Sequence, residues 1–147
     1  MRTIRQILKQ KGKEFWNISP DAMVFEALEM MAAKDVGALL VMKGRKLVGI
    51  FSERDYARKV ILKERSSKET PVGEIMSAHL ISITPDQTNE QGLALMTARH
   101  IRHLPVFSGR KLVGFVSIGD LVKSIIDEQK LVIDKLEKYA TQSGGMN

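Results

Sequence analysis

The sequence contains one internal repeat, and this repeat constrains the possible folds more strongly than any other feature of the chain. The stretch GRKLVGIFSERD, from Gly44 to Asp55, returns as GRKLVGFVSIGD, from Gly109 to Asp120. The same shift of 65 residues aligns residues 16–61 with residues 81–126 without a gap, and about a third of the aligned positions are identical. Self-similarity in one register over this length indicates that the chain is built from two copies of one structural unit.

Each copy shows the same order of secondary-structure signals. A short apolar strand ends at Pro-Asp, a helix follows, and two apolar runs separated by KGR or SGR then predict a β-hairpin with glycine in its turn. A second helix is expected to begin at Ser52 and, in the second copy, at Ser117. We therefore predict an α/β (α+β) fold of two β-α-β-β-α units, packed about a pseudo-two-fold axis so that both sheets are buried.

The first helix of each copy is expected to differ in its cap. In the first copy an apolar stripe follows the helical period at Val24, Ala27, Leu28 and Met31. Thr88 and Gln91 form a Thr-x-x-Gln capping box in the second copy, whereas Met23 occupies the position of Thr88 in the first. The helix of the first copy should therefore have a weaker cap, or a cap supplied by Asp21.

The repeat also sets the expected domain boundaries. Residues 1–61 should form the first unit with an N-terminal helix over TIRQILKQ, residues 62–70 a polar linker, and residues 71–128 the second unit, with a short helix over PVGEIMS. Residues 129–147 should comprise a helix extension and a tail, TQSGGMN, which we expect to be disordered.

This extension carries more apolar residues than the repeat requires. They keep a helical period at Leu121, Val122, Ile125, Ile126, Val132, Ile133, Leu136 and Tyr139. The stripe either folds back on its own domain or contacts a second copy of the chain. We favour the second alternative and expect a homodimer.

Composition limits the classes of partner and compartment. The net charge is +6, but the basic residues are scattered in groups around Lys9–Lys13, Arg54–Lys63 and Arg99–His103. This distribution favours a small anionic ligand over a surface that wraps nucleic acid. The chain has no cysteine, no apolar run long enough to span a bilayer and no signal-peptide core at its start, so we expect a soluble, cytoplasmic protein without a membrane partner.

The doubled pattern resembles a known family. Two units of roughly sixty residues, each reading strand, Pro-Asp, helix, "LLV" or "LPV", glycine hairpin, "LVG", Ser-x-x-Asp and helix, resemble a pair of CBS domains, also called a Bateman module. The resemblance covers about residues 1–128 and extends to stand-alone bacterial and archaeal CBS pairs that are labelled as related to IMP dehydrogenase. It implies a non-catalytic regulatory module that binds AMP, ADP, ATP, NAD(H) or S-adenosylmethionine in the cleft between its units.

The repeated Ser-x-x-Asp has two interpretations. On a single copy the favoured one is a helix cap, because Ser-x-x-Asp at a helix start is close to a capping box. Each motif also follows a strand with a glycine, Gly49 or Gly114, and lies at a strand-to-helix turn where helix amides favour anions. A carboxylate there can accept hydrogen bonds from the two hydroxyls of a ribose, while serine hydroxyls suit phosphate oxygens.

The resemblance implies this division of roles for the site residues. Asp55 and Asp120 would bind ribose, and Ser52 and Ser117 would bind phosphate. Apolar walls for the adenine are expected at Ile18, Ile83 with the adjacent Thr84, Gly37, Ala38, Pro105 and Ile118. The two sites differ in their basic residues, which are expected to contact phosphates: Arg54 and Arg58 in the first copy, and Arg102 and His103 in the second. For Arg102 the alternative is a solvated surface arginine.

Three further functions are weighed against this one. An enzyme is disfavoured because the chain has no cysteine and none of the common nucleophile, zinc-protease or Walker motifs. A nucleic-acid-binding domain is disfavoured because only 5% of residues are aromatic. A metal site at His100 and His103 lacks a third ligand in the sequence, so we expect no metal.

With no output domain in the chain, an effector protein should act in trans.

Overall fold

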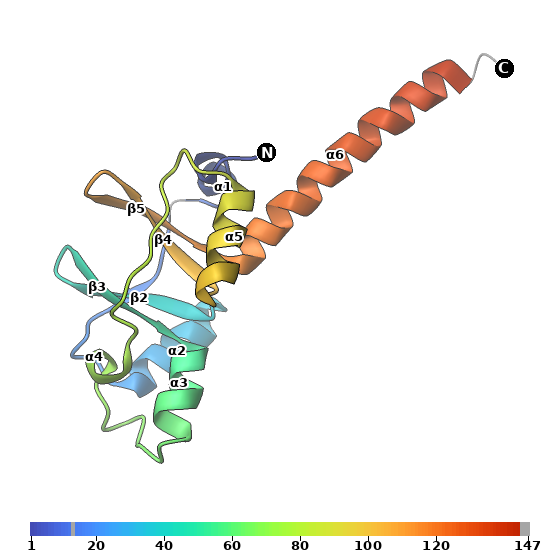
Figure 1. Cartoon of the computed structure of the whole chain (residues 1–147). Coiled ribbons are helices and arrows are strands. Elements are labelled where there is room, and N and C mark those ends of the chain that lie inside the picture. Colours follow the sequence, from blue (N-terminus) through green and yellow to red (C-terminus); the bar gives the residue numbers. More distant parts are fainter. Residues whose placement is uncertain (13, 145–147) are drawn as a thin grey trace. The chain divides into compact units, whose positions relative to one another are not determined.

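The computed structural model describes residues 1–12 and 14–144, and these divide into two compact units (Figure 1). Residues 14–81 form the first-repeat unit, and residues 1–12 together with residues 82–144 form the second-repeat unit. We expected residues 1–61 to form one unit and residues 71–128 the other. Instead, the segment before each repeat packs with the other repeat. The mixed α+β architecture of two repeated units is as predicted.

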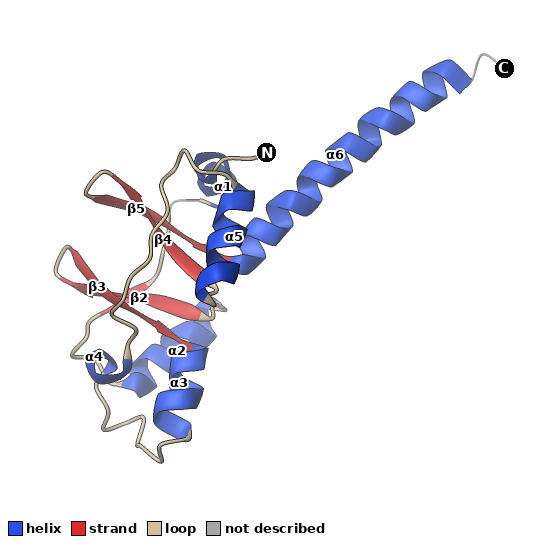
Figure 2. Cartoon of the chain, in the orientation of Figure 1, coloured by secondary structure: helices blue, strands red, loops and turns tan. Residues whose placement is uncertain are grey.

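The first-repeat unit is a three-stranded sheet with helices. Its elements are β1 (Asn17–Ile18), α2 (Val24–Lys34), β2 (Ala38–Lys43), β3 (Lys46–Ser52), α3 (Glu53–Tyr56), the π-helix η1 (Ala57–Ile61) and α4 (Val72–Ile75). Strand β2 lies in the middle, parallel to β1 and antiparallel to β3. Figure 2 shows the β2–β3 hairpin as a pair of red arrows. Gly44 makes the hairpin turn with a φ of 63°, in the left-handed region that glycine adopts without strain. The predicted second helix begins at Ser52, but it changes to a π-helix after one turn.

The segment predicted as a polar linker caps a helix instead. Met23 is the N-cap of α2 and makes no side-chain hydrogen bond, as its sequence predicts. The free amides of Val24 and Phe25 donate to the carbonyls of Thr70 and Ser67, both at 2.9 Å. Backbone carbonyls of this segment therefore supply what the first turn of a helix needs, and a cap from Asp21 is not used.

The second-repeat unit contains a two-stranded sheet and three helices. Its elements are α1 (Ile4–Lys11), α5 (Asn89–Arg99), β4 (His103–Ser108), β5 (Lys111–Ser117) and α6 (Ile118–Gly144). The capping box of Thr88 and Gln91 forms as predicted. The short strand expected at Ile83 is reduced to a single parallel bridge with Val106. Helix α1 packs here because Leu8 fills the space above Gly114, where any Cβ would lie 2.6 Å from the leucine side chain.

Helix α6 is one continuous element that runs past the end of the repeat. Its first half contacts α1, α5 and β5, and Figure 1 shows its second half extending away from these elements. Disorder expected from Thr141 is wrong as far as Gly144, since the helix includes these residues; residues 145–147 lie outside the described part. Leu121, at the start of the predicted stripe, is buried in the unit. The apolar residues beyond residue 128 do not fold back on it: Leu131, Val132, Ile133, Leu136 and Tyr139 are exposed. Among the described helices, including α6, there is none with the length and apolar character that crossing a bilayer requires.

Candidate functional site: the two Ser-x-x-Asp turns

Both Ser-x-x-Asp turns are placed by the same pairing of strand ends. In the first-repeat unit Ala38 pairs with Ser52, and the Glu53 amide donates to the Gly37 carbonyl at 3.1 Å. This pairing brings together the predicted residues Gly37, Ala38 and Ser52 at the helix start that also carries Asp55.

The second-repeat unit repeats the arrangement. His103 pairs with Ser117, and the Ile118 amide donates to the Arg102 carbonyl at 2.8 Å. Predicted residues Arg102, His103, Ser117 and Ile118 therefore lie side by side, on the turn that leads to Asp120.

Each turn is also a complete capping box, as the simpler interpretation of the sequence predicts. The Asp55 amide donates to Ser52 Oγ at 3.2 Å, and the Ser52 amide donates to Asp55 Oδ2 at 3.0 Å. The Asp120 amide donates to Ser117 Oγ at 3.1 Å, and the Ser117 amide donates to Asp120 Oδ2 at 2.8 Å. Capping uses one oxygen of each carboxylate, so the function of each aspartate depends on what meets the other oxygen.

Asp55 has both oxygens occupied. Besides the cap, Oδ2 accepts a bond from the Ser52 hydroxyl at 3.0 Å. Oδ1 accepts a bond from the Ser77 hydroxyl at 3.0 Å and lies 3.0 Å from Lys59 Nζ. The residue is buried, with 7% of its surface exposed. A buried carboxylate with this many partners is a well-satisfied structural anchor.

Asp120 is more open, and its second partner is a single lysine. Lys11 Nζ lies 2.6 Å from Oδ2 and also donates to the Phe115 carbonyl at 2.7 Å. The side chains of Asp120 and Lys11 keep 25% and 34% of their surfaces exposed. Burial by itself would raise the pKa of Asp120, but the hydrogen bonds from Lys11 and the Ser117 amide outweigh it and hold that pKa below its ordinary value. Asp120 is therefore a carboxylate at neutral pH.

His103 is the neutral member of this group. Its ring stacks on Phe115 with centroids 5.5 Å apart. Burial, helped by the charges of Lys11 and Arg102 and opposed by that of Asp120, lowers its pKa from 6.5 to about 4. The imidazole offers a neutral hydrogen-bonding group at pH 7 and not a second cation, in contrast to the basic pair expected from the sequence.

The remaining predicted residues divide by burial. Arg54, Arg58, Arg102 and Thr84 are exposed, and Ile118 is 40% exposed. Ile18, Ile83, Ala38 and Pro105 are buried; Ile18 belongs to the core of its unit, and the Ile83 side chain lies against Gly92 of α5. The expected adenine walls at Ile18 and Ile83 thus have most of their side-chain surface in use within the units.

Sequence reasoning missed three partners of the aspartates. Lys59 follows Asp55 by four residues, a spacing that predicts a helical ion pair and that was available in the sequence. Lys11 and Ser77 come from the segments that pack with the opposite repeat, and no local pattern pointed to them.

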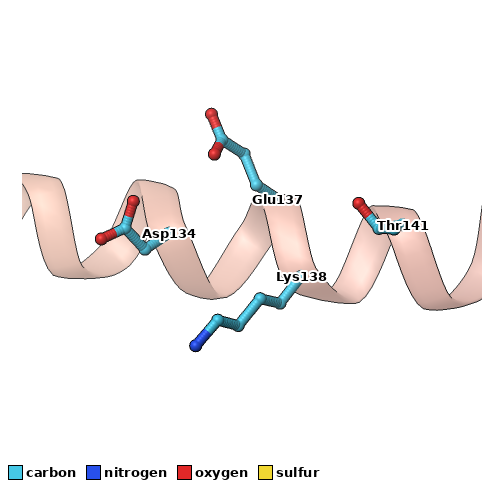
Figure 3. A pocket seen from close by; sticks show the side chains of 4 residues that line it. All are labelled: Asp134, Glu137, Lys138 and Thr141. Carbon is cyan, nitrogen blue, oxygen red and sulfur yellow. The ribbon is translucent and has the colours of Figure 1, made fainter.

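The end of α5 and the surface of α6 are weaker candidates for a binding site. His100 caps the end of α5 with a φ of 55°, and the described residues contain no group of three potential ligands that could hold a metal ion. A shallow pocket beside α6 is lined by Asp134, Glu137, Lys138 and Thr141, whose side chains Figure 3 shows. All four side chains come from one helix, so they form a ridge and not an enclosed site.

Comparison with known proteins places both repeats in one family. The matching family is described as the CBS domain, and it matches residues 12–62 and 72–127. The mitochondrial CBS domain-containing protein CBSX3 of Arabidopsis thaliana is 40% identical over 147 residues, covering 93% of this chain and 71% of that protein. A structure of a CBS-domain protein from Burkholderia ambifaria MC40-6 is 49% identical, with a TM-score of 0.83, and covers 86% of this chain and 96% of that chain.

A more distant structure shows the same fold with ligands. The CBS domain pair of protein MJ0100, in complex with 5′-methylthioadenosine and S-adenosyl-L-methionine, has a TM-score of 0.76. It is 22% identical, and the match covers 87% of this chain and 98% of that one. At this identity the likeness concerns the fold alone.

Proposed function

Because the chain belongs to the CBS domain family, as a tandem pair, we propose that it is a regulatory module that binds an adenosine-containing ligand at a Ser-x-x-Asp turn. The observation that carries the proposal is the construction of this turn twice, each time with an ionised or hydrogen-bonded aspartate at the junction of a strand and a helix. A carboxylate in that position can accept the hydroxyl protons of a ribose. Two finer predictions from the sequence remain predictions. One is that the chain is related to the CBS pair of IMP dehydrogenase, and the other is that the ligand binds in a cleft between the two units.

The class of ligand is supported by chemistry and by one distant relative. Exposed Arg102 accompanies the second-repeat turn, and exposed Arg54 and Arg58 accompany the first-repeat turn. A positive charge beside the turn that binds suits the phosphates of AMP, ATP or NAD. The CBS pair of MJ0100 holds two adenosine-containing molecules, which makes this class the first to test here. The signal would reach an effector protein in trans.

Two measurements test the proposal. Mass spectrometry of small molecules released from the denatured protein should detect an adenosine-containing compound. Calorimetric titration with AMP, ATP, NAD and S-adenosylmethionine should give saturable binding for at least one of them, and the guanine counterpart GMP should bind more weakly than AMP. No binding of any adenosine compound would contradict the proposal, and conversion of ATP or NAD to product would replace it with an enzymatic function.

We also propose that the module forms a homodimer. The support is the exposed apolar stripe on the second half of α6, which has no partner among the described residues of its own unit.

A further inference from the structure

We propose that only the second-repeat turn binds the ligand, and that Lys11 makes this site specific for an adenosine compound with a negatively charged phosphate. The inference rests on the proposed function and deepens it. It assigns Asp55 a structural role, Asp120 the ribose, and Lys11, from a helix 109 residues away in sequence, the phosphate.

The first-repeat turn has no capacity left for a ligand. A carboxylate offers about four lone-pair positions. Asp55 fills them with the Ser52 amide, the hydroxyls of Ser52 and Ser77, and the ammonium of Lys59. A ribose would have to displace the last two partners from a residue that is 7% exposed. Each hydrogen bond from a ribose hydroxyl to Asp55 would replace an equivalent bond within the protein, so these bonds would add no net free energy of binding.

The second-repeat turn still has capacity. The hydrogen bonds that Asp120 accepts from Lys11 and from the Ser117 amide both end on Oδ2. Oδ1 therefore has room for the hydroxyls of a ribose, and a quarter of the side chain is exposed to receive them. Among the residues of this unit that were predicted as walls for the adenine, Ile118 and Thr84 are exposed, whereas Ile83 and Pro105 are buried.

Lys11 has one donor left beside that carboxylate. An ammonium group has three N–H donors. Lys11 gives one to Asp120 and one to the Phe115 carbonyl, which leaves the third for a ligand oxygen. This third bond requires no rupture of the ion pair, so Lys11 can join a ribose-binding carboxylate to a phosphate.

The local charge selects among adenosine compounds. Lys11 and Arg102 are positive, Asp120 is negative and His103 is neutral, so the group carries a net charge of about +1 before a ligand binds. A phosphate is attracted by this charge, whereas S-adenosylmethionine is repelled because its sulfonium and ammonium groups outweigh its one carboxylate and leave it a net positive charge. AMP should therefore bind more tightly than adenosine or S-adenosylmethionine.

The first test compares the two aspartates by calorimetric titration with AMP. The wild type should bind one AMP per chain. Asp120→Asn should weaken binding about ten- to a hundredfold, the effect of losing a charge-assisted hydrogen bond. Asp55→Asn should leave the affinity within about twofold, measured well below its melting temperature, and should lower that temperature instead. Two AMP per chain, or an equal loss of affinity in both variants, would overturn the inference while leaving the proposed function intact.

The second test isolates Lys11 through the ratio of affinities for AMP and adenosine. Lys11→Met keeps the aliphatic stem and should weaken AMP about ten- to a hundredfold while changing adenosine much less. Lys59→Met removes the corresponding partner of Asp55, and Lys9→Met removes an exposed charge from the same helix; both should keep the wild-type ratio. Equal losses for AMP and adenosine in Lys11→Met would show that Lys11 only positions Asp120, which contradicts the assignment to phosphate. A wild type that binds neither compound, nor any other adenosine compound, would overturn the proposed function itself.

Discussion

At the scale of single residues, His103 ties the stability of the second-repeat unit to pH. Its pKa is lowered to about 4 in the folded protein, against 6.5 as the ordinary value. Between these values the unfolded chain binds a proton that the folded chain does not, so stability is lost as the pH falls from about 6.5 towards 4. The loss is at most on the order of 3 kcal/mol. Urea unfolding at pH 7, 6, 5 and 4.5 should follow this slope in the wild type.

The control for this prediction keeps the stack but removes the titration. His103→Phe places a ring that cannot take up a proton against Phe115, and it should flatten the decline between pH 6.5 and 4.5. Asp120 does not confuse the result, because its pKa is held below its ordinary value of 3.8 and its contribution is lost only below this window. An unchanged slope in His103→Phe would assign the pH dependence to other groups.

At the scale of secondary-structure elements, strand β3 and the end of α4 approach so closely that only glycine fits between them. A Cβ added at Gly49 would lie 2.5 Å from Met76 Sδ and 3.1 Å from the Ser77 carbonyl oxygen. That carbonyl is held by the Ile50 amide at 3.0 Å and cannot easily move. Gly49→Ala should therefore cost about 1–3 kcal/mol of unfolding free energy, measured by urea titration.

A second glycine gives the matched control. Gly119 lies in the first turn of α6, where an added Cβ would meet only Ser117 Oγ at an ordinary 3.6 Å. Gly119→Ala should be neutral or stabilise by up to about 1 kcal/mol, because alanine favours the helix. If both variants lost the same stability, the close approach at Gly49 would not be the reason.

At the scale of the whole molecule, the second half of α6 should hold two chains together. Ile133 and Leu131 are equally exposed, at 53% and 51%, but two residues apart on a helix they face different directions. Val132, Leu136 and Tyr139 follow the seven-residue pattern of a helix pair. Ile133 lies beside Leu136 at the edge of this stripe, and Leu131 lies outside it. Light scattering should give about twice the 16.5 kDa chain mass for the wild type and for Leu131→Glu, and a shift towards the monomer for Ile133→Glu.

Truncation after Ile126 provides the complementary test of the dimer. It removes the exposed stripe, although it also removes Glu128, which accepts hydrogen bonds from the Arg2 amide and Asn89. The point variants are therefore the more specific test. A wild type that stays monomeric at high concentration would contradict the homodimer. Ile133→Glu should keep the wild-type affinity for nucleotides, because the Ser117–Asp120 turn lies at the start of α6, away from Ile133.

The sequence by itself determined the repeat, the order of elements and the two Ser-x-x-Asp turns. Each of these depends on residues close together in the chain. Apolar periodicity fixes a helix or a strand, glycine at Gly44 and Gly109 permits the hairpin turns, and serine at Ser52 or Ser117 bonds an amide three residues later. Such local hydrogen bonds can be read from spacing alone, which is why these features were predicted correctly.

Only the tertiary structure decided which segment packs with which repeat. This packing also determines that Asp55 is enclosed while Asp120 is more exposed. Helix α1 packs with the second repeat and α4 with the first, so Lys11 meets Asp120 and Ser77 meets Asp55, across 109 and 22 residues of sequence. The strand GRKLVG and the spacing from serine to aspartate are the same in the two copies, and Lys59 is the one partner that lies close to its aspartate in the sequence. Lys11 and Ser77 come from other segments, so the sequence could not predict that Asp55 would be enclosed and Asp120 left more open. The physical reason is that burial and ion pairing depend on surfaces brought together by folding, and these surfaces come from segments that carry no local signal of their destination.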